Sequence, residues 1–157
     1  MEELRKIKAT LLYVVQDEKV LLGRKLKGFG TGKINGVGGK VQENESVETA
    51  MVRETQEEFG ITPIDVVYSG KIIYDEFMKG EHVIFETYVF VCREYSGELI
   101  TTEEMQPIWF DKNNLPYEDM FGDDRFWLPQ VLDGLKIEGF FKFDEEFNII
   151  EKNVRVF

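Results

Sequence analysis

The sequence is poor in the residue types that mark several classes of protein. Cysteine occurs once, as Cys92 in the apolar run YVFVC, so no intramolecular disulfide can form and we expect a buried thiol. Histidine also occurs once, as His82, beside the turn-like Lys79-Gly80-Glu81, and we expect no catalytic role for it. No run approaches the roughly 18 apolar residues that a membrane-spanning helix needs, so we expect no membrane partner.

Positive charge is also scarce. The 19 Lys and Arg residues are outnumbered by 30 Asp and Glu residues, which gives a formal net charge of −11. Such a surface repels nucleic-acid polymers and anionic membranes, but a small phosphate ligand stays compatible because a bound metal ion inverts the local field. The first residues, MEELRKIK, contain no apolar signal core, so we expect a cytoplasmic protein. We also expect a monomer, although the sequence leaves an oligomer open.

The 157 residues and their 43% hydrophobic content fit one globular domain over 1–157. Turn residues, near Ser96-Gly97 among other places, separate β-rich runs, and Asn113 to Pro116 breaks regular structure. We expect a hairpin of 6–16 and 20–25, a helix over 46–60, strands over 64–77, 83–93 and 105–111, a second helix from 123 or 124 to about 135, and a closing hairpin over 137–157. This order predicts an α/β fold with helices packed on a mixed sheet.

The stretch from Gly39 to Ile61, GKVQENESVETAMVRETQEEFGI, holds the most informative pattern. Ser46 can cap the start of a helix and Gly60 can end it in the left-handed conformation. At about 100° per residue, the acidic residues continue the apolar face of this helix. That face consists of Val47, Ala50, Met51, Glu54 and Glu58, with Glu57 at its border.

A solvated surface is the usual explanation of a charge run, but it fits this helix badly. Glu54 and Glu58 are like charges at i,i+4 in the C-terminal half, where the helix dipole is also negative. Partial burial of such carboxylates is costly unless positive charge is supplied. Arg53 supplies one charge, and the remainder indicates a hard divalent cation, Mg²⁺ or alternatively Mn²⁺.

The segment before this helix, Gly28 to Gly39, reads GFGTGKINGVGG and is neither a G-x-G-x-x-G nor a Walker loop in context. It could be a mobile surface loop. It could instead be a backbone that passes close to a ligand, where side chains would interfere. Because it runs directly into the acidic helix, we favour the second interpretation.

These residues together resemble the signature of the Nudix hydrolases, G-x5-E-x7-R-E-U-x-E-E-x-G-U, where U is aliphatic. The matching positions are Gly39, Glu45, Arg53, Glu54, Glu57, Glu58, Gly60 and Ile61. Thr55 departs from the pattern, which usually has an aliphatic residue there, and we expect only a small packing change. The resemblance implies an α/β/α sandwich with a mixed β-sheet and the hydrolysis of a nucleoside diphosphate linked to a further group.

The resemblance also implies roles for individual residues. Glu54, Glu57, Glu58 and the carbonyl of Gly38 would ligate Mg²⁺, and Arg53 would orient the acids. Glu57 is the candidate general base. Glu104 matches an acidic position near the metal site and is a weaker candidate ligand.

Outside the signature, the chain resembles the branch of the family that hydrolyses oxidised purine nucleoside triphosphates in animals. The runs that carry this similarity are KGFGTGKINGVGGKVQENES, EEMQPIWF, LPYEDMFGDDRFWLP and GFFKF. By position, Asn35, Asp123 and Asp124 would read the purine edge, and Phe29 and Phe121 would stack on the base. Further positions that would line the pocket are Thr10, Lys25, Tyr74, Met105, Trp127 and Phe143. Phe121 stands where the animal enzymes carry tryptophan.

Taken alone, Asp123-Asp124 could be a helix cap. Two adjacent aspartates in a pocket, however, cannot both ionise cheaply, so one can hold a proton and donate a hydrogen bond. We therefore predict Mg²⁺-dependent hydrolysis of 8-oxo-dGTP, with 2-hydroxy-dATP as a further substrate, to the monophosphate and pyrophosphate. The alternatives are a Nudix enzyme of other specificity and a non-catalytic nucleotide-binding module, which the retained metal-binding acids disfavour.

Overall fold

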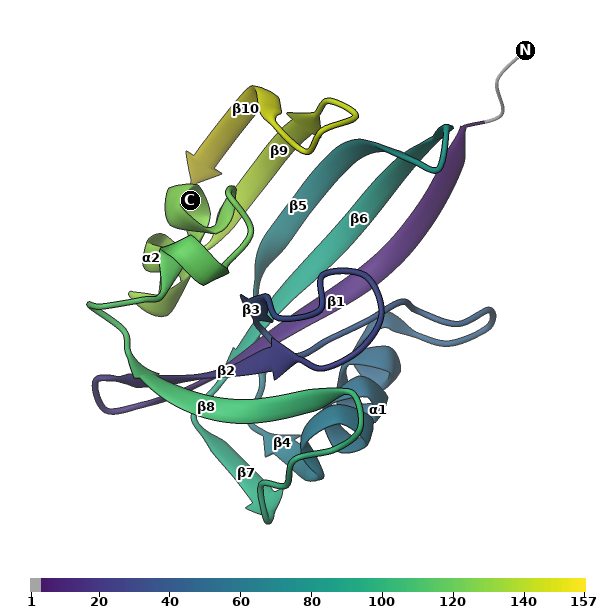
Figure 1. Ribbon diagram of the computed structural model, residues 1–157. Helices are drawn as coiled ribbons and strands as arrows, with labels where there is room; N and C mark the ends of the chain where they lie inside the picture. Colours follow the sequence, from purple (N-terminus) through teal and green to yellow (C-terminus); the bar gives the residue numbers. More distant parts are fainter. Residues whose placement is uncertain (1–3) are drawn as a thin grey trace.

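The computed structural model describes residues 4–157, so the first three residues of the N-terminal segment lie outside it. One large mixed sheet runs through the molecule, with a helix on each side (Figure 1). The elements in chain order are β1 (Arg5–Gln16), β2 (Lys19–Lys25), β3 (Ile34–Asn35), α1 (Val47–Phe59), β4 (Ile61–Ile64), β5 (Val67–Met78), β6 (Glu81–Cys92), β7 (Glu94–Gly97), β8 (Met105–Asp111), the 3₁₀ turn η1 (Tyr117–Asp119), α2 (Asp124–Leu132), β9 (Ile137–Phe143) and β10 (Ile149–Val156).

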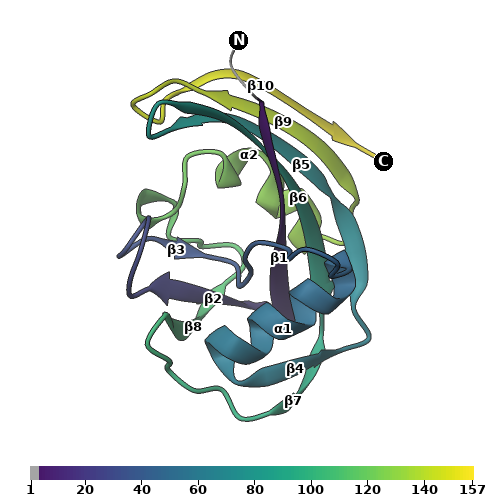
Figure 2. The same cartoon turned by 90° about the vertical axis from the view of Figure 1, so that its right-hand side faces the viewer.

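The sheet follows the order β10-β9-β5-β6-β1-β2-β3, and β8 pairs with β2. The pairs β1–β6 and β5–β9 are parallel, whereas the hairpin partners are antiparallel. The predicted mixed sheet is therefore confirmed. Figure 2 shows the strands β10, β9, β5, β6 and β1 arching over the rest of the chain, and the cavity described below lies on this concave side.

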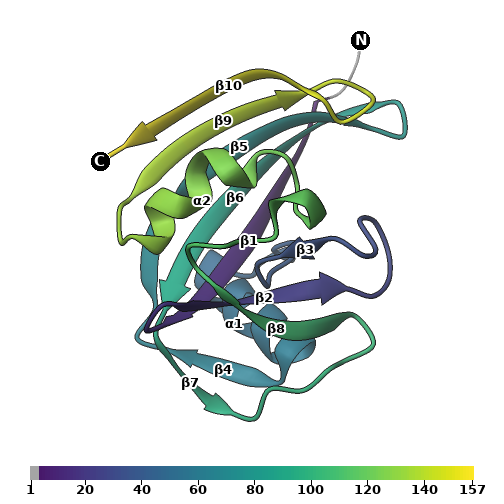
Figure 3. The ribbon, with the colours of Figure 1, turned by 60° about the vertical axis from the view of Figure 1, so that its left-hand side comes forward.

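The two faces of the sheet carry separate hydrophobic cores because side chains alternate along each strand. Leu12 and Val14 point from β1 toward α1, where they pack with Met51 and other apolar residues. Tyr13 points to the other face, where the core contains Trp127 of α2. Figure 3 shows α2 in front of the sheet and α1 behind it, which is the layered α/β/α arrangement.

Helix α1 has the ends that its sequence predicted. The Ser46 hydroxyl accepts a hydrogen bond from the Thr49 backbone N–H at 3.1 Å, and Gly60 adopts a φ of 74°. Thr55, in the usually aliphatic slot, donates its hydroxyl to the Met51 carbonyl at 2.8 Å. Because the buried hydroxyl is paired within the helix, Thr55 fits a core position at little cost.

Three boundaries differ from the expected ones. The predicted strand over 64–77 is broken at Asp65, whose φ of 53° interrupts the extended backbone and separates β4 from β5. The expected turn at Ser96-Gly97 is the end of β7, which pairs with β4 in a small second sheet. The second helix ends at Leu132 rather than near 135, because the chain turns through the left-handed Gly134.

The single cysteine and the single histidine both have structural surroundings. Cys92 is buried as expected, and burial raises the pKa of its thiol to about 11. His82 lies 2.6 Å from Asp75 and stacks on Phe77, away from the cavity described below. In the described part of the chain, no helix combines the length and the apolar character needed to cross a membrane.

Candidate active site

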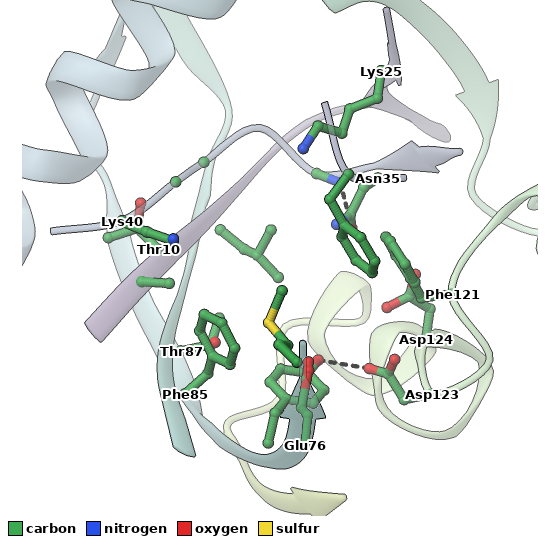
Figure 4. Close-up of a pocket in the computed structure, with 18 of the residues that line it drawn as sticks. Thr10, Lys25, Asn35, Lys40, Glu76, Phe85, Thr87, Phe121, Asp123 and Asp124 are labelled. Atoms are coloured by element: carbon green, nitrogen blue, oxygen red, sulfur yellow. Dashed lines mark hydrogen bonds between the residues drawn. The ribbon is translucent and has the colours of Figure 1, made fainter. Parts of the chain in front are cut away.

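A cavity of about 410 Å³ opens between the concave face of the sheet, the glycine-rich segment and the start of α2 (Figure 4). Most of the residues that were predicted from the sequence to bind substrate line this cavity. These are Thr10, Lys25, Phe29, Asn35, Tyr74, Met105, Phe121, Asp123, Asp124 and Phe143, together with Gly38 and Glu58 from the predicted metal site. The structure thus brings residues from distant parts of the sequence into one space.

The adjacent aspartates form one end of this cavity. Both side chains are only 2% exposed. Asp123 Oδ2 accepts hydrogen bonds from the Tyr74 hydroxyl at 2.6 Å and from Trp127 Nε1 at 2.8 Å. Asp123 stands at the N-terminus of α2, but within the described chain its side chain makes no capping hydrogen bond. The carboxylate is therefore held toward the sheet, and Trp127 supports it from beneath the cavity wall.

The two carboxyl groups differ in how they are held. Burial raises the pKa of both, but hydrogen bonds from Tyr74 and Trp127 favour the ionised form of Asp123 and oppose this shift. The pKa of Asp124 is raised well above its usual range by burial and by the charge of Asp123. The pair therefore keeps a proton more readily than two isolated carboxyl groups would, and it can both accept and donate hydrogen bonds.

Aromatic rings form the walls near the cavity mouth. Phe29 and Phe121 are stacked, with centroids 6.2 Å apart and an interplanar angle of 15°. A flat base between them needs about 7 Å, which is twice the van der Waals separation of carbon atoms. Phe29 is 55% exposed, so solvent rather than packed protein borders much of its side chain. Phe147, which the sequence did not nominate, lies 5.4 Å from Phe29 and supports it from the side.

The cavity is also lined by residues that the sequence did not indicate. Lys40 lies at the exposed edge, and β6 contributes Phe85 and Thr87. Glu76 and Met78 follow Tyr74 at alternate positions on β5 and therefore share its face. That alternation was readable in the sequence, but only the pairing of β5 with β6 and β9 shows which face it is.

The glycine-rich segment approaches other parts of the protein very closely. A Cβ at Gly38 would overlap the carbonyl oxygen of Thr10 on β1. A Cβ at Gly39 would lie 2.5 Å from the carboxyl carbon of Glu54. The glycines thus let this backbone run between β1 and the acidic helix. At its start, Asn35 Oδ1 accepts a 2.8 Å hydrogen bond from the Gly36 N–H, which leaves the amide NH₂ of Asn35 to act as a donor.

Arg53 is the centre of the acidic cluster on α1. Its Nε and Nη2 donate to the two carboxylate oxygens of Glu45 at 2.7 and 2.9 Å. Nη1 lies 3.0 Å from Glu54 Oε1 and 3.3 Å from Glu57 Oε2. The guanidinium lowers the pKa of Glu45 to about 2. Arg53 therefore fixes the positions of Glu54 and Glu57 relative to the loop that carries Glu45.

The acids of the predicted metal site have different environments. Glu58 is 7% exposed at the cavity wall, and its pKa is raised to about 9 by burial and then by the nearby charges of Glu54 and Glu104. The side chain of Glu57 is 53% exposed. Among residues 4–157, no three acidic, histidine or cysteine side chains are grouped closely enough to hold a metal ion as they stand.

Comparison with known proteins identifies the family to which this sequence and fold belong. The NUDIX domain family matches residues 5–131. The chain belongs to the Nudix family. An oxidized purine nucleoside triphosphate hydrolase of Danio rerio is 42% identical to this chain over 142 residues, which cover 90% of each protein. The Mus musculus protein of the same name is 38% identical over 146 residues, which cover 93% of this chain and 92% of the mouse protein. The crystal structure of a MutT protein from Bacillus halodurans superimposes with a TM-score of 0.82 at 25% identity, covering 94% of this chain and 97% of that one.

Nudix proteins typically depend on a divalent metal ion, and the donor set of this chain fits one. Glu58 is a buried acid whose neighbours Glu54 and Glu104 are like-charged, so a cation among them would relieve their repulsion. Carboxylate and backbone carbonyl oxygens are the ligands that hard divalent cations take. The absence of a side chain at Gly39 leaves Glu54 the room that it occupies.

Proposed function

We propose that this chain hydrolyses oxidised purine nucleoside triphosphates, 8-oxo-dGTP foremost and 2-hydroxy-dATP as a further substrate, to the monophosphate and pyrophosphate. The observation that carries this proposal is a single cavity with the acidic helix at one end and a buried aspartate pair at the other. The metal-binding signature accounts for phosphate chemistry, and the aspartate pair accounts for recognition of a base. The Danio rerio and Mus musculus relatives, which cover most of this chain, carry the same activity in their names.

In this proposal the base lies between Phe29 and Phe121. Stacking contributes about 1–3 kcal/mol per base without selecting which base it is. Selection falls to Asn35, Asp123 and Asp124. The Asn35 amide donates, the ionised Asp123 accepts, and the protonated Asp124 can do both. Such a pair can match more than one purine tautomer by moving its proton.

At the other end, Glu54, Glu57, Glu58 and the Gly38 carbonyl would hold Mg²⁺, with Mn²⁺ as the alternative and Glu104 as a further ligand. A bound metal ion would neutralise phosphate charge and lower the pKa of an attacking water. Arg53 orients Glu54 and Glu57 through the contacts described above. Glu57, the most exposed of the three α1 acids, is the proposed general base that takes the proton of this water.

The bond changes of the proposed reaction balance. A water oxygen forms a bond to the β-phosphorus, and the bond from this phosphorus to the oxygen that bridges to the α-phosphate breaks. The nucleoside monophosphate leaves with that oxygen, and pyrophosphate is the other product. Lys25, at the cavity wall beside Glu58, supplies positive charge near the phosphates.

The test is product analysis in the presence of Mg²⁺. We would compare kcat/KM for 8-oxo-dGTP, 2-hydroxy-dATP, dGTP, dATP, ADP-ribose and diadenosine tetraphosphate. Preference for an oxidised purine, with monophosphate and pyrophosphate as products, supports the proposal. Preference for an ordinary nucleotide or for ADP-ribose would reject the base pocket while retaining the metal chemistry, and absence of turnover would reject the activity. Asp123→Ala should impair base selection more than the dependence on Mg²⁺.

A further inference from the structure

The inner end of the cavity contains a carboxyl group that the proposed reaction does not use. Glu76 lies on β5, two residues after Tyr74, and faces into the cavity from the sheet. Its carboxyl group lies at the same end of the cavity as that of Asp123 (Figure 4). The base pocket therefore has an acidic side chain on β5 at the same end as the aspartate pair at the start of α2.

One carboxyl oxygen of Glu76 is left without a hydrogen bond by the described part of the chain. Its Oε2 is buried, and among residues 4–157 it has no hydrogen-bond partner. The Tyr74 hydroxyl and the Trp127 indole N–H both donate to Asp123 Oδ2. A buried polar atom without a partner is costly, and most such atoms in proteins are satisfied. An unpartnered atom that lines a cavity therefore indicates a ligand group that completes it.

Asp124 repeats this observation on the other side. Its side chain is 2% exposed and lines the cavity, and its Oδ2 likewise has no partner in the described chain. Two carboxyl groups on different elements thus present unused oxygens to one space. An ionised carboxyl group only accepts hydrogen bonds, so the ligand edge that complements ionised Glu76 carries an N–H or amino group rather than a further acceptor.

We infer that Glu76 is a specificity residue that accepts a hydrogen bond from the 2-amino group or the N7–H of the bound purine. This inference rests on the proposed function for the identity of the pocket, and it adds a reader on β5 to Asn35, Asp123 and Asp124. Burial and the charge of Asp123 raise the pKa of Glu76 to about 7, as expected for a carboxyl group whose ionised form lacks a hydrogen-bond donor. Purines with more N–H groups on their edges are the ligands it favours. 8-Oxoguanine has such a group at N7, where guanine has an acceptor.

The experiment measures binding, so that it needs neither turnover nor metal. Titration calorimetry gives the Kd of dGMP, dIMP and 8-oxo-dGMP for the wild type, Glu76→Gln and Glu76→Met. The pair dGMP and dIMP isolates the 2-amino group, and the pair 8-oxo-dGMP and dGMP isolates the oxidised edge. Asp75→Asn is the control, because it removes the adjacent carboxyl, which pairs with His82 and does not line the cavity.

In Glu76→Met we expect the preference within at least one pair to fall by about tenfold or more, the usual range for a hydrogen bond to a charged group. Glu76→Gln, which keeps one acceptor, should show a smaller change, and Asp75→Asn none. Equal changes for all three nucleotides, or no change, would overturn the inference. If the wild type bound these nucleotides but hydrolysed none of their triphosphates, the proposed activity would fail while the role of Glu76 would still be decided by the Kd ratios.

Discussion

The Tyr74 hydroxyl donates a 2.6 Å hydrogen bond to Asp123 and so ties β5 to the start of α2. Tyr74→Phe would leave a buried carboxylate with one donor fewer, and we expect the free energy of unfolding to fall by about 1–3 kcal/mol. Urea denaturation measures this. Tyr13→Phe is the matched control, because the Tyr13 hydroxyl is buried without a partner in residues 4–157 and its loss should cost little. Equal losses in the two variants would contradict the prediction.

Substitution of Glu57 should affect turnover much more than it affects the stability of the fold. Its side chain is 53% exposed, so Glu57→Gln should change the free energy of unfolding by only about 0.5 kcal/mol. Its loss as a proposed metal ligand and base should nevertheless abolish turnover. Steady-state kinetics and thermal denaturation of the same preparation test both statements, and a fully active variant would remove Glu57 from the mechanism.

Two neighbouring glycines should respond differently to alanine. At Gly39 the new Cβ meets the end of the Glu54 side chain, which can move, so Gly39→Ala should fold and lose about tenfold or more in kcat through the displaced acid. At Gly38 it meets the Thr10 backbone, which cannot easily move, so Gly38→Ala should lose about 1–3 kcal/mol of stability. Denaturation and steady-state kinetics on both variants test this. A larger loss of stability in Gly39→Ala than in Gly38→Ala would contradict the prediction.

Phe121 contributes stacking without reading the base. Phe121→Ala should weaken binding of purine monophosphates by about 1–3 kcal/mol each, because one face of the base loses its aromatic partner. The ratios between different purines should stay near their wild-type values. Calorimetric Kd values across several nucleotides test this, and a loss confined to one base would show that Phe121 takes part in selection.

The raised pKa of Glu76 predicts a pH dependence of stability. Between its ordinary value of 4.5 and its folded value of about 7, the folded state binds more protons than the unfolded state, so stability falls as pH rises through this window. The full shift corresponds to about 3 kcal/mol, and partial solvent screening reduces this to roughly 1–2 kcal/mol.

Glu76→Gln removes this contribution. Glu58 also has a raised pKa, so wild type and variant must be compared at each pH. Denaturant unfolding at pH 5 and pH 8 should show the variant gaining stability relative to the wild type at the higher pH. A stability difference that did not change with pH would refute the shift.

Local patterns in the sequence were sufficient for the helix that carries the signature. Ser46 and Gly60 mark its ends through interactions with backbone groups only a few residues away, and the spacing of Glu54 and Glu58 follows from the helical period. The division of β4 from β5 was missed because it depends on one residue, Asp65, in a left-handed conformation that asparagine and aspartate adopt only occasionally.

The cavity itself was decided by tertiary structure. Tyr74 and Asp123 are 49 positions apart, and their hydrogen bond exists only because β5 pairs with β9 and α2 packs on that face. Glu76 shows the same limit. Its alternation with Tyr74 was visible in the sequence, but its burial and its unpartnered oxygen follow from non-local strand pairing. The sequence by itself determined the chemistry that α1 can carry, since a helix period is local, and the fold alone decided which side chains share the space beside it.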